Sequence, residues 1–432
     1  MDRLTQYQKI LAGNPTMAAA VRRVCFPPDD PVAVASACVL GPALGSFTQW
    51  LLANAMARGV RRLYFLARDG YLMRQAGEIL CQTLGLPVDC RYLYCSRYAL
   101  RLPNFHRDQN QALDFLCRDA TGITSDRILR RAGLTPQERG EILPLLDLPP
   151  HAAIARSRLP EIRRALAGCP AFLDKMDRHS REAMPGLAGY LAQAGLLEEI
   201  PYALVDSGWI GTVQNTLGNT LAAMASRRRL EGYYFGLYAL PPEAQRTDYH
   251  CYYFAPEDGL TKKVHFSNCL FEAVFTAPHG MTLGYRHQNG RYVPRLGPDP
   301  DSGVFRKSQG YLCQYIQALA AQTQRLDTSA LDRQTVAKLL TAFMTRPTRA
   351  EAEAFGSLPF SDDVLAGDEG QLAPSLTPAR HPLQGWKSPW YAGSLARSGG
   401  HIRYHQFQYA LLQYLRYSRK IYQARRERRG KR

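Results

Sequence analysis

Short apolar runs of strand length alternate with segments of helical periodicity in two separate stretches of the chain. Residues 61–67 (RRLYFLA) and 91–96 (RYLYCS) have the composition of buried strands, and residues 71–85 between them repeat apolar side chains at helical spacing. The same order returns with a strand expected at 201–206 (PYALVD) and a helix over about 211–225. This alternation predicts an α/β fold with a mostly parallel, Rossmann-like sheet.

The remaining segments extend this core. A polar, helical block separates the two stretches, and Ser125 is the expected N-cap of one of its helices. Further elements are expected as strands at 230–240 and 248–256, a Gly/Pro/Asp-rich link at 290–303, and helices within 304–345 and 403–425. We divide the chain into the first half of the α/β core with N-terminal helices (1–103), a helical insertion or cap (104–198), the second half of the core (199–290) and a helical C-terminal region with a basic tail (291–432).

The charge of the chain is strongly positive and unevenly placed. Lys and Arg number 54 against 37 Asp and Glu, a net charge of +17, and residues 416–432 supply +8 of it. Such a surface favours phosphate-rich partners. The tail is either a solvated helix end or an electrostatic tether to an anionic membrane. No zinc finger, RNP-type strand or GxxG loop accompanies it, which argues against nucleic acid as a partner.

Cysteine use and apolar segments bear on the compartment. The ten cysteines form no CxxC pair, and most lie among apolar neighbours, as small buried thiols do in a reducing cytosol. Residues 32–57 carry no charge and are long enough to span a bilayer, but Gly41 and Pro42 interrupt them and their second half is amphipathic. We expect a buried helix pair there, in a cytoplasmic protein that is either free or peripheral at the inner face of the membrane.

Polar signals follow three of the expected strands, and ligands of parallel sheets bind at the carboxyl ends of the strands. The first signal is LARDGY, in which Arg68 offers a planar donor fork to phosphate oxygens. Gly70 lets the backbone approach a ligand at a helix N-terminus. Asp69 between them has three open roles: a Mg²⁺ ligand, a group that orients an acceptor hydroxyl, or a simple N-cap.

The second and third signals are CSRYALR and VDSGWIGT. After the second strand, Arg97 is a candidate phosphate clamp beside Ser96, with a surface ion pair as the alternative. After the third strand, Asp206 precedes a loop that either binds a phosphate or is a plain strand–turn–helix. The residues that carry hydroxyls or accessible backbone N–H groups there are Ser207, Gly208, Gly211 and Thr212.

Other catalytic patterns are weaker. Glu272 and His279 lie in the apolar segment 269–285, where each is a general base or a satisfied core residue, the core interpretation being favoured for His279. The D-x-D pair Asp299 and Asp301 lies in the expected link, which argues against a haloacid-dehalogenase phosphatase or a nucleotide-sugar glycosyltransferase. The sequence has no P-loop, dinucleotide fingerprint, G-x-S-x-G or HExxH motif.

Two of these signals resemble the ligand loops of type I phosphoribosyltransferases. In that fold one loop contacts the pyrophosphate of 5-phosphoribosyl diphosphate (PRPP). Another loop, typically two acids followed by small residues and Thr-Gly, holds the ribose and the 5-phosphate. Residues 67–71 are similar to the first loop and residues 206–212 to the second. Ser207 stands where the second acid is usual, which leaves Asp206 as the single acid of this loop.

The chain more closely resembles a bacterial family of cell-surface polysaccharide loci (capsule, O antigen). Members carry FLaRDGY, YlyvSR and vDiGWxGTxQ, often beside or fused to a haloacid-dehalogenase domain. This sequence has YFLARDGYLM, YLYCSRYALRLP and LVDSGWIGTVQNTL in that order, within a region of similarity covering residues 35–290. The resemblance implies a phosphoribosyltransferase-like fold and a Mg²⁺-dependent glycosyltransferase that moves 5-phosphoribosyl from PRPP to a glycan acceptor, lipid-linked or free. A separate phosphatase would then leave ribofuranose.

The resemblance also implies roles for single residues. Asp69 would hold Mg²⁺ or act as the base, Asp206 would hold a ribose hydroxyl, and Arg68 would bind the diphosphate. The substrate-binding residues within the motifs are Gly70, Tyr71, Ser96, Arg97, Ser207, Gly208, Trp209, Gly211, Thr212 and Gln214. From the apolar segment 269–285, and not from the resemblance, we add Glu272 to the catalytic set and His279 to the binding set. Trp386 and Trp390 are expected either to shape an acceptor groove or to belong to the core.

Three other functions stay open. A non-catalytic module that binds PRPP or a phosphosugar is favoured by the single acid at Asp206. A sugar-phosphate phosphatase is suggested by the neighbours of the family, although the motif of its nucleophilic aspartate is missing. A scaffold held to the membrane by its basic tail is the third.

Overall fold

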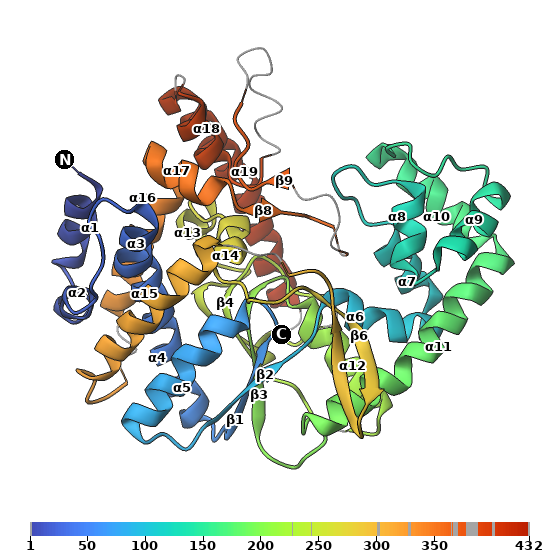
Figure 1. Cartoon of the computed structure of the whole chain (residues 1–432), viewed down its shortest axis with the longest axis horizontal. Coiled ribbons are helices and arrows are strands. Elements are labelled where there is room, and N and C mark those ends of the chain that lie inside the picture. The colour runs from blue at the N-terminus through green and yellow to red at the C-terminus, as the bar shows by residue number, and fades with distance from the viewer. Residues whose placement is uncertain are drawn as a thin grey trace.

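A five-stranded sheet in which every strand is parallel forms the centre of the protein (Figure 1). The computed structural model describes residues 2–226, 228–242, 244–299, 303–326, 330–363, 365, 370–376, 388–399 and 402–430. The strand order is β2–β1–β3–β4–β5, with bounds β1 Arg62–Leu66, β2 Asp89–Leu93, β3 Tyr202–Trp209, β4 Gly232–Leu237 and β5 Tyr249–Phe254. The predicted α/β class with a parallel sheet is confirmed.

Helices cover both faces of this sheet and form separate lobes around it. In chain order they are α1 Arg3–Leu11, α2 Pro15–Arg22, α3 Pro31–Ala35, α4 Gly41–Ala57, α5 Gly70–Leu84, α6 Arg97–Arg101, α7 Gln109–Leu116, α8 Ser125–Arg131, α9 Pro136–Leu145, α10 Leu159–Ala167, α11 Pro170–Gln193, α12 Thr212–Ala223, α13 Leu260–Val264, α14 Asn268–Val274, α15 Gly303–Ala320, α16 Ala330–Thr345, α17 Arg349–Gly356, α18 Tyr391–Ser398 and α19 Ile402–Gly430.

The central strand β1 shows why both faces are covered. All five of its residues are buried, and alternate side chains point to opposite sides of the sheet. Leu63 and Phe65 join the larger core, which also contains buried residues of α4, α5 and α15. Tyr64 and Leu66 join a second core with residues of α11 and α12. Two-sided burial of this kind holds the carboxyl ends of the strands in a fixed arrangement.

The uncharged segment near the N-terminus is a single helical run, and not the expected pair of helices. It spans Pro31–Ala57, is long and apolar enough to cross a membrane, and has 94% of its most apolar window buried inside the protein. A π-helical turn, Ser36–Leu40, precedes Gly41 and Pro42 and absorbs the missing proline N–H without ending the run. A Cβ on Gly41 would lie 2.6 Å from the ring of Tyr315, so glycine allows α15 to pack directly on this helix.

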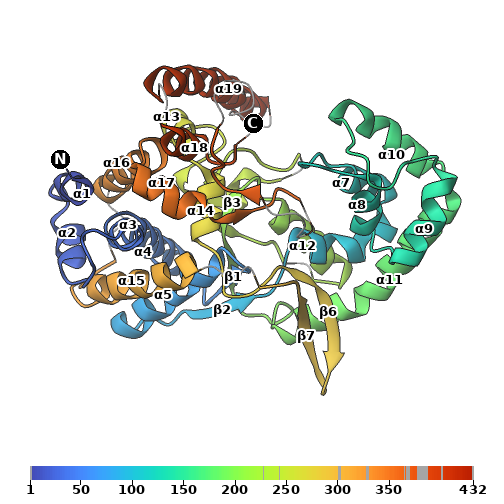
Figure 2. The same cartoon turned by 45° about the horizontal axis from the view of Figure 1, so that its top comes forward.

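The polar block between the two halves of the core is helical, as predicted. Helices α7 to α11 pack around their own cluster of buried residues and stand to one side of the sheet (Figure 2). The N-cap of α8 is Thr124, whose hydroxyl accepts from the Arg127 backbone N–H, and Ser125 is the first helical residue. The expected cap was therefore wrong by one position.

Two expected connections also differ from the structure. The second strand ends at Leu93 and not at 96, because Ser96 caps α6 with its side chain. The expected link at 290–303 begins with a strand: β6 (Thr282–Gln288) and β7 (Arg291–Leu296) form an antiparallel hairpin that projects from the body (Figure 2). The hairpin is attached to α11, since Tyr285 stacks on Tyr190 with ring centroids 4.5 Å apart.

Candidate functional site

The order of the strands selects one place on the sheet for a ligand. Strand β1 lies between β2 and β3, so the chain leaves β1 toward one side and leaves β3 toward the other. In open parallel sheets, ligands bind in the crevice outside the carboxyl ends of the strands at such a switch point. Phe65 of β1 pairs with Val205 of β3, and the loops that follow these strands flank the crevice. They are the segments that the sequence selected, but the expected boundary after Asp206 was wrong: β3 continues to Trp209, because Gly208 and Trp209 still pair with β4.

The loop after β1 and the last position of β3 each contain a non-glycine residue with a left-handed backbone. Arg68 has a φ of 73° and Trp209 a φ of 74°, a conformation that costs about 1–3 kcal/mol and persists where the surroundings enforce it. The Arg68 N–H donates to the hydroxyl of Tyr92 at 2.8 Å. The carbonyl of Trp209 accepts from the Tyr238 N–H at 2.7 Å. Matched backbone strain at the ends of two adjacent strands is characteristic of a binding site.

Glycines at the same level have no room for a side chain. A Cβ on Gly70 would lie 2.9 Å from the carbonyl carbon of Phe65. Gly208 has a φ of 112°, and its Cβ would lie 2.5 Å from the carbonyl oxygen of Gly236. Gly211 has a φ of 63°, and its Cβ would lie 2.6 Å from the ring of Tyr249. These glycines bring the loops close to the sheet and leave backbone groups accessible.

Two helices begin at this crevice without a side-chain cap. α5 starts directly after Asp69 and α12 directly after Gly211, and neither residue makes a capping hydrogen bond. At α5 the Tyr71 N–H already donates to the Arg68 carbonyl at 2.9 Å, but no side chain caps either helix, and the helix dipoles favour an anion at both N-termini. The simple N-cap interpretation of Asp69 is wrong. Its carboxylate accepts a hydrogen bond from the hydroxyl of Ser207, across the crevice.

A third segment adds a carboxylate to the site. Glu272 belongs to α14, and its carboxylate accepts from the indole N–H of Trp209. The Trp209 ring packs on Phe266 and Phe271, with ring centroids 5.3 and 5.8 Å away. Glu272 is thus neither isolated nor a plain core residue, because its partner is a residue of the loop that follows Asp206.

The three carboxyls Asp69, Asp206 and Glu272 interact electrostatically. Burial, followed by repulsion from Glu272, raises the pKa of Asp206 to about 7. Burial, and then the charges of Glu272 and Asp206, raise the pKa of Asp69 well above its usual value. Burial also raises the pKa of Glu272, and the positive charges of Arg97 and Arg68 act against this rise. Three acids and two arginines therefore form one cluster at the switch point.

His279 lies behind this cluster in a chain of hydrogen bonds. The Tyr92 hydroxyl, which accepts from Arg68, lies 2.8 Å from Nε2 of His279. Nδ1 lies 2.8 Å from the carbonyl of Gly280. A carbonyl only accepts, so Nδ1 carries the proton and Nε2 accepts from Tyr92. Burial lowers the pKa of His279, which favours this neutral form. The favoured interpretation as a satisfied residue therefore agrees with the contacts of His279, which supports the strained backbone of Arg68.

The other proposed residues divide between the crevice and the interior. Arg97 is exposed and Thr212 opens α12, so both border the crevice. Ser96 instead caps α6 and donates to the carbonyl of Thr282 at 2.6 Å. Gln214 is buried, and its amide is engaged by the Leu230 carbonyl and the Tyr234 hydroxyl. The contacts of Ser96 and Gln214 are structural, and neither side chain has a free group to offer a ligand.

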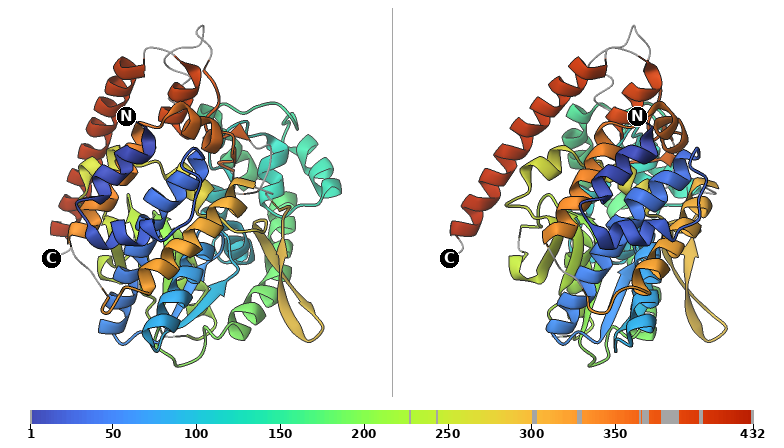
Figure 3. Two further views of the ribbon diagram at one scale, coloured as in Figure 1. Left: turned by 60° about the vertical axis from the view of Figure 1, so that its left-hand side comes forward. Right: turned by 90° about the vertical axis from the view of Figure 1, so that its left-hand side faces the viewer.

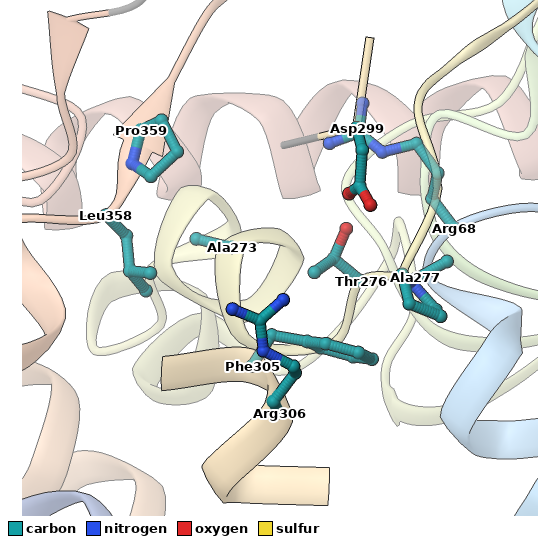
Figure 4. Close-up of a pocket in the computed structure, with 10 residues that line it drawn as sticks. Arg68, Ala273, Thr276, Ala277, Asp299, Phe305, Arg306, Leu358 and Pro359 are labelled. Atoms are coloured by element: carbon teal, nitrogen blue, oxygen red, sulfur yellow. The ribbon is translucent and has the colours of Figure 1, made fainter. Parts of the chain in front are cut away.

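Tyr71 and Asp299 flank Arg68. The ring of Tyr71 packs against Tyr92, with centroids 5.7 Å apart. Asp299 lines a small cavity of about 40 Å³ together with Arg68, Thr276 and Arg306 (Figure 4). The sequence had assigned Asp299 to a link without function; its D-x-D partner, Asp301, lies outside the described residues. No local signal in the sequence connects Asp299 with Arg68.

A much larger cavity lies on the other side of Trp209. Its volume is about 1020 Å³, and Ile210 of the β3 loop and Tyr238 form its wall on the side of the site. Its aromatic lining is Tyr238, Phe266, Trp390, Tyr391, Phe407, Tyr409 and Tyr417; its basic lining is Lys263, His265, Arg346, Arg416 and Lys420. No acid lines it among the described residues. Such a cavity suits an anionic ligand with ring surfaces.

Trp390 and Trp386 are the two tryptophans that the sequence assigned either to an acceptor groove or to the core. Trp390 is almost fully buried and its indole N–H donates to the Met344 carbonyl at 2.8 Å, so it is a core residue with one edge on the large cavity. Trp386 lies outside the described residues.

The donor set at the switch point fits a magnesium ion bound together with a ligand. Among the described residues, no three His, Cys, Asp or Glu side chains are close enough to hold a metal by themselves. Mg²⁺ usually takes one or two carboxylates and completes its shell with phosphate oxygens and water. Asp69, at the start of α5 and beside Ser207, offers such a carboxylate, and a cation there would offset the repulsion from Glu272 and Asp206 that helps to raise its pKa.

No family model matches the sequence, and no curated protein matches it.

Proposed function

We propose that this chain is a PRPP-dependent phosphoribosyltransferase that places 5-phosphoribosyl on a hydroxyl of a bacterial surface glycan and releases pyrophosphate. The observation that carries the proposal is the joining of the two motif loops. Ser207 of the second loop donates to Asp69 of the first, at the switch point of a parallel sheet and between two uncapped helix N-termini. A sugar that carries phosphate groups at both ends needs two anion sites, and two helix N-termini can supply them.

The two phosphate groups of PRPP are assigned to different loops. The 5-phosphate is held by the first N–H groups of α12 and the hydroxyl of Thr212, since Gly211 leaves this helix end uncapped. The diphosphate is held by Arg68, Arg97 and the start of α5, with the small cavity beside Arg68 at its far end. Asp206 accepts a hydrogen bond from a ribose hydroxyl between them.

Asp69 is the residue that we assign to Mg²⁺. A bound Mg²⁺ would supply charge neutralisation for the departing diphosphate. Ser207 orients the Asp69 carboxylate, and Arg68 places a positive charge beside it. With the diphosphate present, these residues stabilise negative charge where it develops, which is the main catalytic requirement of this reaction.

The reaction exchanges one bond at C1 of the ribose. The bond from C1 to the diphosphate oxygen breaks with its electron pair on the diphosphate, and a bond forms from C1 to the acceptor oxygen. The acceptor hydroxyl loses its proton to a base. We assign the base to Glu272, because burial raises its pKa above the usual value of a glutamate and the Trp209 indole fixes its carboxylate. Trp209 packs on Phe266 and Tyr238, which also line the large cavity.

The large cavity is the site that we assign to the acceptor. Its aromatic walls can stack on the apolar faces of sugar rings, and its basic residues require negative charge on the acceptor. A glycan that carries a phosphate or diphosphate at its reducing end, as a lipid-linked glycan does, fits both properties. The phosphate that remains on the transferred ribose would be removed by a separate phosphatase.

The assignment of the fold as phosphoribosyltransferase-like belongs to the same proposal. Its support is the parallel order β2–β1–β3–β4–β5 and the placement of the two similar loops after β1 and β3. A sugar-phosphate phosphatase has less support, because Ala67 and Arg68, and not a nucleophilic aspartate, follow β1.

Two measurements separate the transferase from the alternatives. PRPP with Mg²⁺ should raise the melting temperature of the protein, and addition of a lipid-linked or phosphorylated glycan acceptor should then release pyrophosphate. A binding module would show the thermal shift with no release by any acceptor. A phosphatase would release inorganic phosphate from ribose 5-phosphate without an acceptor. Either result would overturn the assignment.

A further inference from the structure

The C-terminal helix α19 runs along one side of the molecule, with one face packed against the body and one face exposed (Figure 3). Its inner face is held by aromatic contacts. Tyr417 stacks on Tyr238 with centroids 5.3 Å apart, and Tyr409 lies 4.6 Å from Tyr391. Ile421 is buried on the same side. These contacts fix the rotation of α19, and therefore which of its side chains face outward.

The outer face of α19 carries a row of exposed apolar side chains. Phe407, Leu411, Leu415 and Tyr422 are 68%, 51%, 54% and 69% exposed. Their spacing of four, four and seven residues places them on one side of the helix. Among the described residues, nine large apolar side chains are exposed, and five of them lie on α19. Single exposed apolar residues are ordinary, but a continuous row marks an interaction surface.

The same row continues as positive charge. Arg419 follows Leu415 by four residues and Arg426 follows Tyr422 by four, so both arginines extend the apolar row toward the C-terminus. Residues 402–430 contain eight Lys and Arg against one acid, Glu427. An apolar face combined with an almost wholly basic composition is the pattern of a helix that lies in the surface of an anionic membrane.

We propose that α19 binds an anionic lipid bilayer along this outer face. Leu411, Leu415 and Tyr422 enter the boundary between headgroups and acyl chains, and Arg419 and Arg426 contact lipid phosphates. A second copy of the chain is a poor occupant of the face, because packing two such helices together would bring two strongly basic segments into contact. The sequence had placed the tether at 416–432; the apolar anchor begins earlier, at Phe407.

Membrane binding along this face would also set the position of the large cavity. Phe407 and Arg416 of α19 line that cavity, so its wall would lie at the lipid surface. If the proposed transferase function holds, a lipid-linked acceptor could enter from the bilayer without leaving it. This consequence rests on the proposed function, whereas the membrane binding of α19 does not.

The test is co-sedimentation of the full chain with vesicles of phosphatidylcholine alone and of phosphatidylcholine mixed with phosphatidylglycerol. Wild type should bind the mixed vesicles and bind neutral vesicles on the order of tenfold more weakly. The double variant Leu411→Glu/Leu415→Glu should lose binding to the mixed vesicles, and Leu411→Ser/Leu415→Ser should weaken it without adding charge. The double variant Arg419→Gln/Arg426→Gln should bind the mixed vesicles more weakly than wild type and with a smaller dependence on salt.

A matched control makes the same two leucine-to-glutamate substitutions at exposed positions outside α19. Leu145 and Leu197 are also exposed, at 64% and 43%, and Leu145→Glu/Leu197→Glu should bind the mixed vesicles as wild type does. Equal binding to neutral and anionic vesicles would overturn the proposal, and so would unchanged binding by both leucine variants. A dimer in solution that the glutamate variant dissociates would instead assign the face to a second copy. The melting temperature of each variant with and without PRPP reports separately on folding and on the proposed transferase site.

Discussion

The hydroxyl of Ser207 donates a hydrogen bond to the carboxylate of Asp69, and this bond joins the end of β3 to the loop that follows β1. The two residues are 138 positions apart in the chain. A charged hydrogen bond of this kind contributes roughly 1.5–3 kcal/mol. Here it holds a carboxylate between two helix N-termini, where a metal–diphosphate complex is expected.

Removal of either partner of this bond should reduce turnover to different extents. Asp69→Asn should lower pyrophosphate release from PRPP by about 100-fold to 10,000-fold, because the charge that binds Mg²⁺ is lost. Ser207→Ala should cost about tenfold, because the carboxylate stays but is no longer oriented. Asp126→Asn, a surface carboxylate paired with Arg139, is the control and should leave the rate unchanged. Equal losses in the two site variants would argue for a purely structural bond.

Replacement of Arg68 by lysine, which keeps the positive charge, should weaken PRPP binding. Arg68→Lys removes the planar donor fork, so the KM for PRPP should rise by about tenfold or more while kcat changes less. Arg74→Lys is the matched control in α5, the helix that follows Arg68, where the Arg74 side chain pairs with Glu78. Its effect on the KM for PRPP should be negligible. Steady-state kinetics with varied PRPP separate the two parameters, and an unaffected KM in Arg68→Lys would remove Arg68 from the diphosphate site.

Two glycine substitutions should change the free energy of unfolding in opposite directions. Gly208→Ala forces a Cβ against the Gly236 carbonyl at a φ of 112°, so it should destabilise the fold by about 1–3 kcal/mol and weaken PRPP binding. Gly310→Ala lies in α15 with nothing within 4 Å of the added Cβ, and should stabilise the fold by up to about 1 kcal/mol. Urea unfolding measures both. A neutral Gly208→Ala would contradict the described loop.

Asp206 should make the stability of the protein fall as the pH rises. Its pKa is about 7 in the folded chain against an ordinary value of 3.8, so the folded state retains a proton that the unfolded state has lost between these pH values. The free energy of unfolding therefore decreases from about pH 4 to about pH 7. Asp206→Asn removes this dependence and should raise stability at about pH 8 by about 1–4 kcal/mol, while it abolishes turnover.

Thermal unfolding in the presence of a chelator, at about pH 5 and about pH 8, tests this effect. The variant should exceed wild type in stability by more at the higher pH than at the lower one, where part of the difference remains because about pH 5 still lies above the ordinary pKa of 3.8. Loss of stability in Asp206→Asn at both pH values would mean that the carboxylate is favourably paired and that the cluster is not repulsive.

Substitutions in the wall of the large cavity should raise the KM for the acceptor and leave the KM for PRPP unchanged. Arg416→Gln/Lys420→Gln removes two positive charges from its wall and should raise the KM for a phosphorylated glycan acceptor by about tenfold or more. Arg156→Gln/Arg158→Gln removes the same charge from the exposed insertion and serves as the control. A parallel rise in the KM for PRPP would show that the cavity belongs to the donor site.

The sequence was sufficient for the core and for the loops that follow its strands. The apolar run in RRLYFLA predicts a strand buried on both faces, and an acid followed by one or more glycines after such a strand predicts a helix start. The ends of the elements were predicted less well: β2 ends before Ser96, because the Ser96 hydroxyl caps the next helix. The π-helical turn before Gly41 depends on packing against α15, which no local pattern encodes.

The features of the site that the sequence did not predict depend on contacts between segments far apart in the chain. Asp206 lacks a neighbouring acid in the chain, and the second acid of its surroundings, Glu272, arrives from α14, 66 residues later in the numbering. Asp299 meets Arg68 only because the hairpin β6–β7 returns the chain to this side of the sheet. Gln214, selected by its place in a motif, is used inside the protein because Tyr234 and Leu230 engage its amide.

The most direct test of the central claim is pyrophosphate release from PRPP in the presence of Mg²⁺ and a phosphorylated or lipid-linked glycan acceptor, with the product identified by mass spectrometry. The account predicts stoichiometric pyrophosphate and an acceptor heavier by one phosphoribosyl group, both absent with Asp69→Asn. A wild-type protein that neither releases pyrophosphate with any such acceptor nor gains thermal stability with PRPP would contradict it.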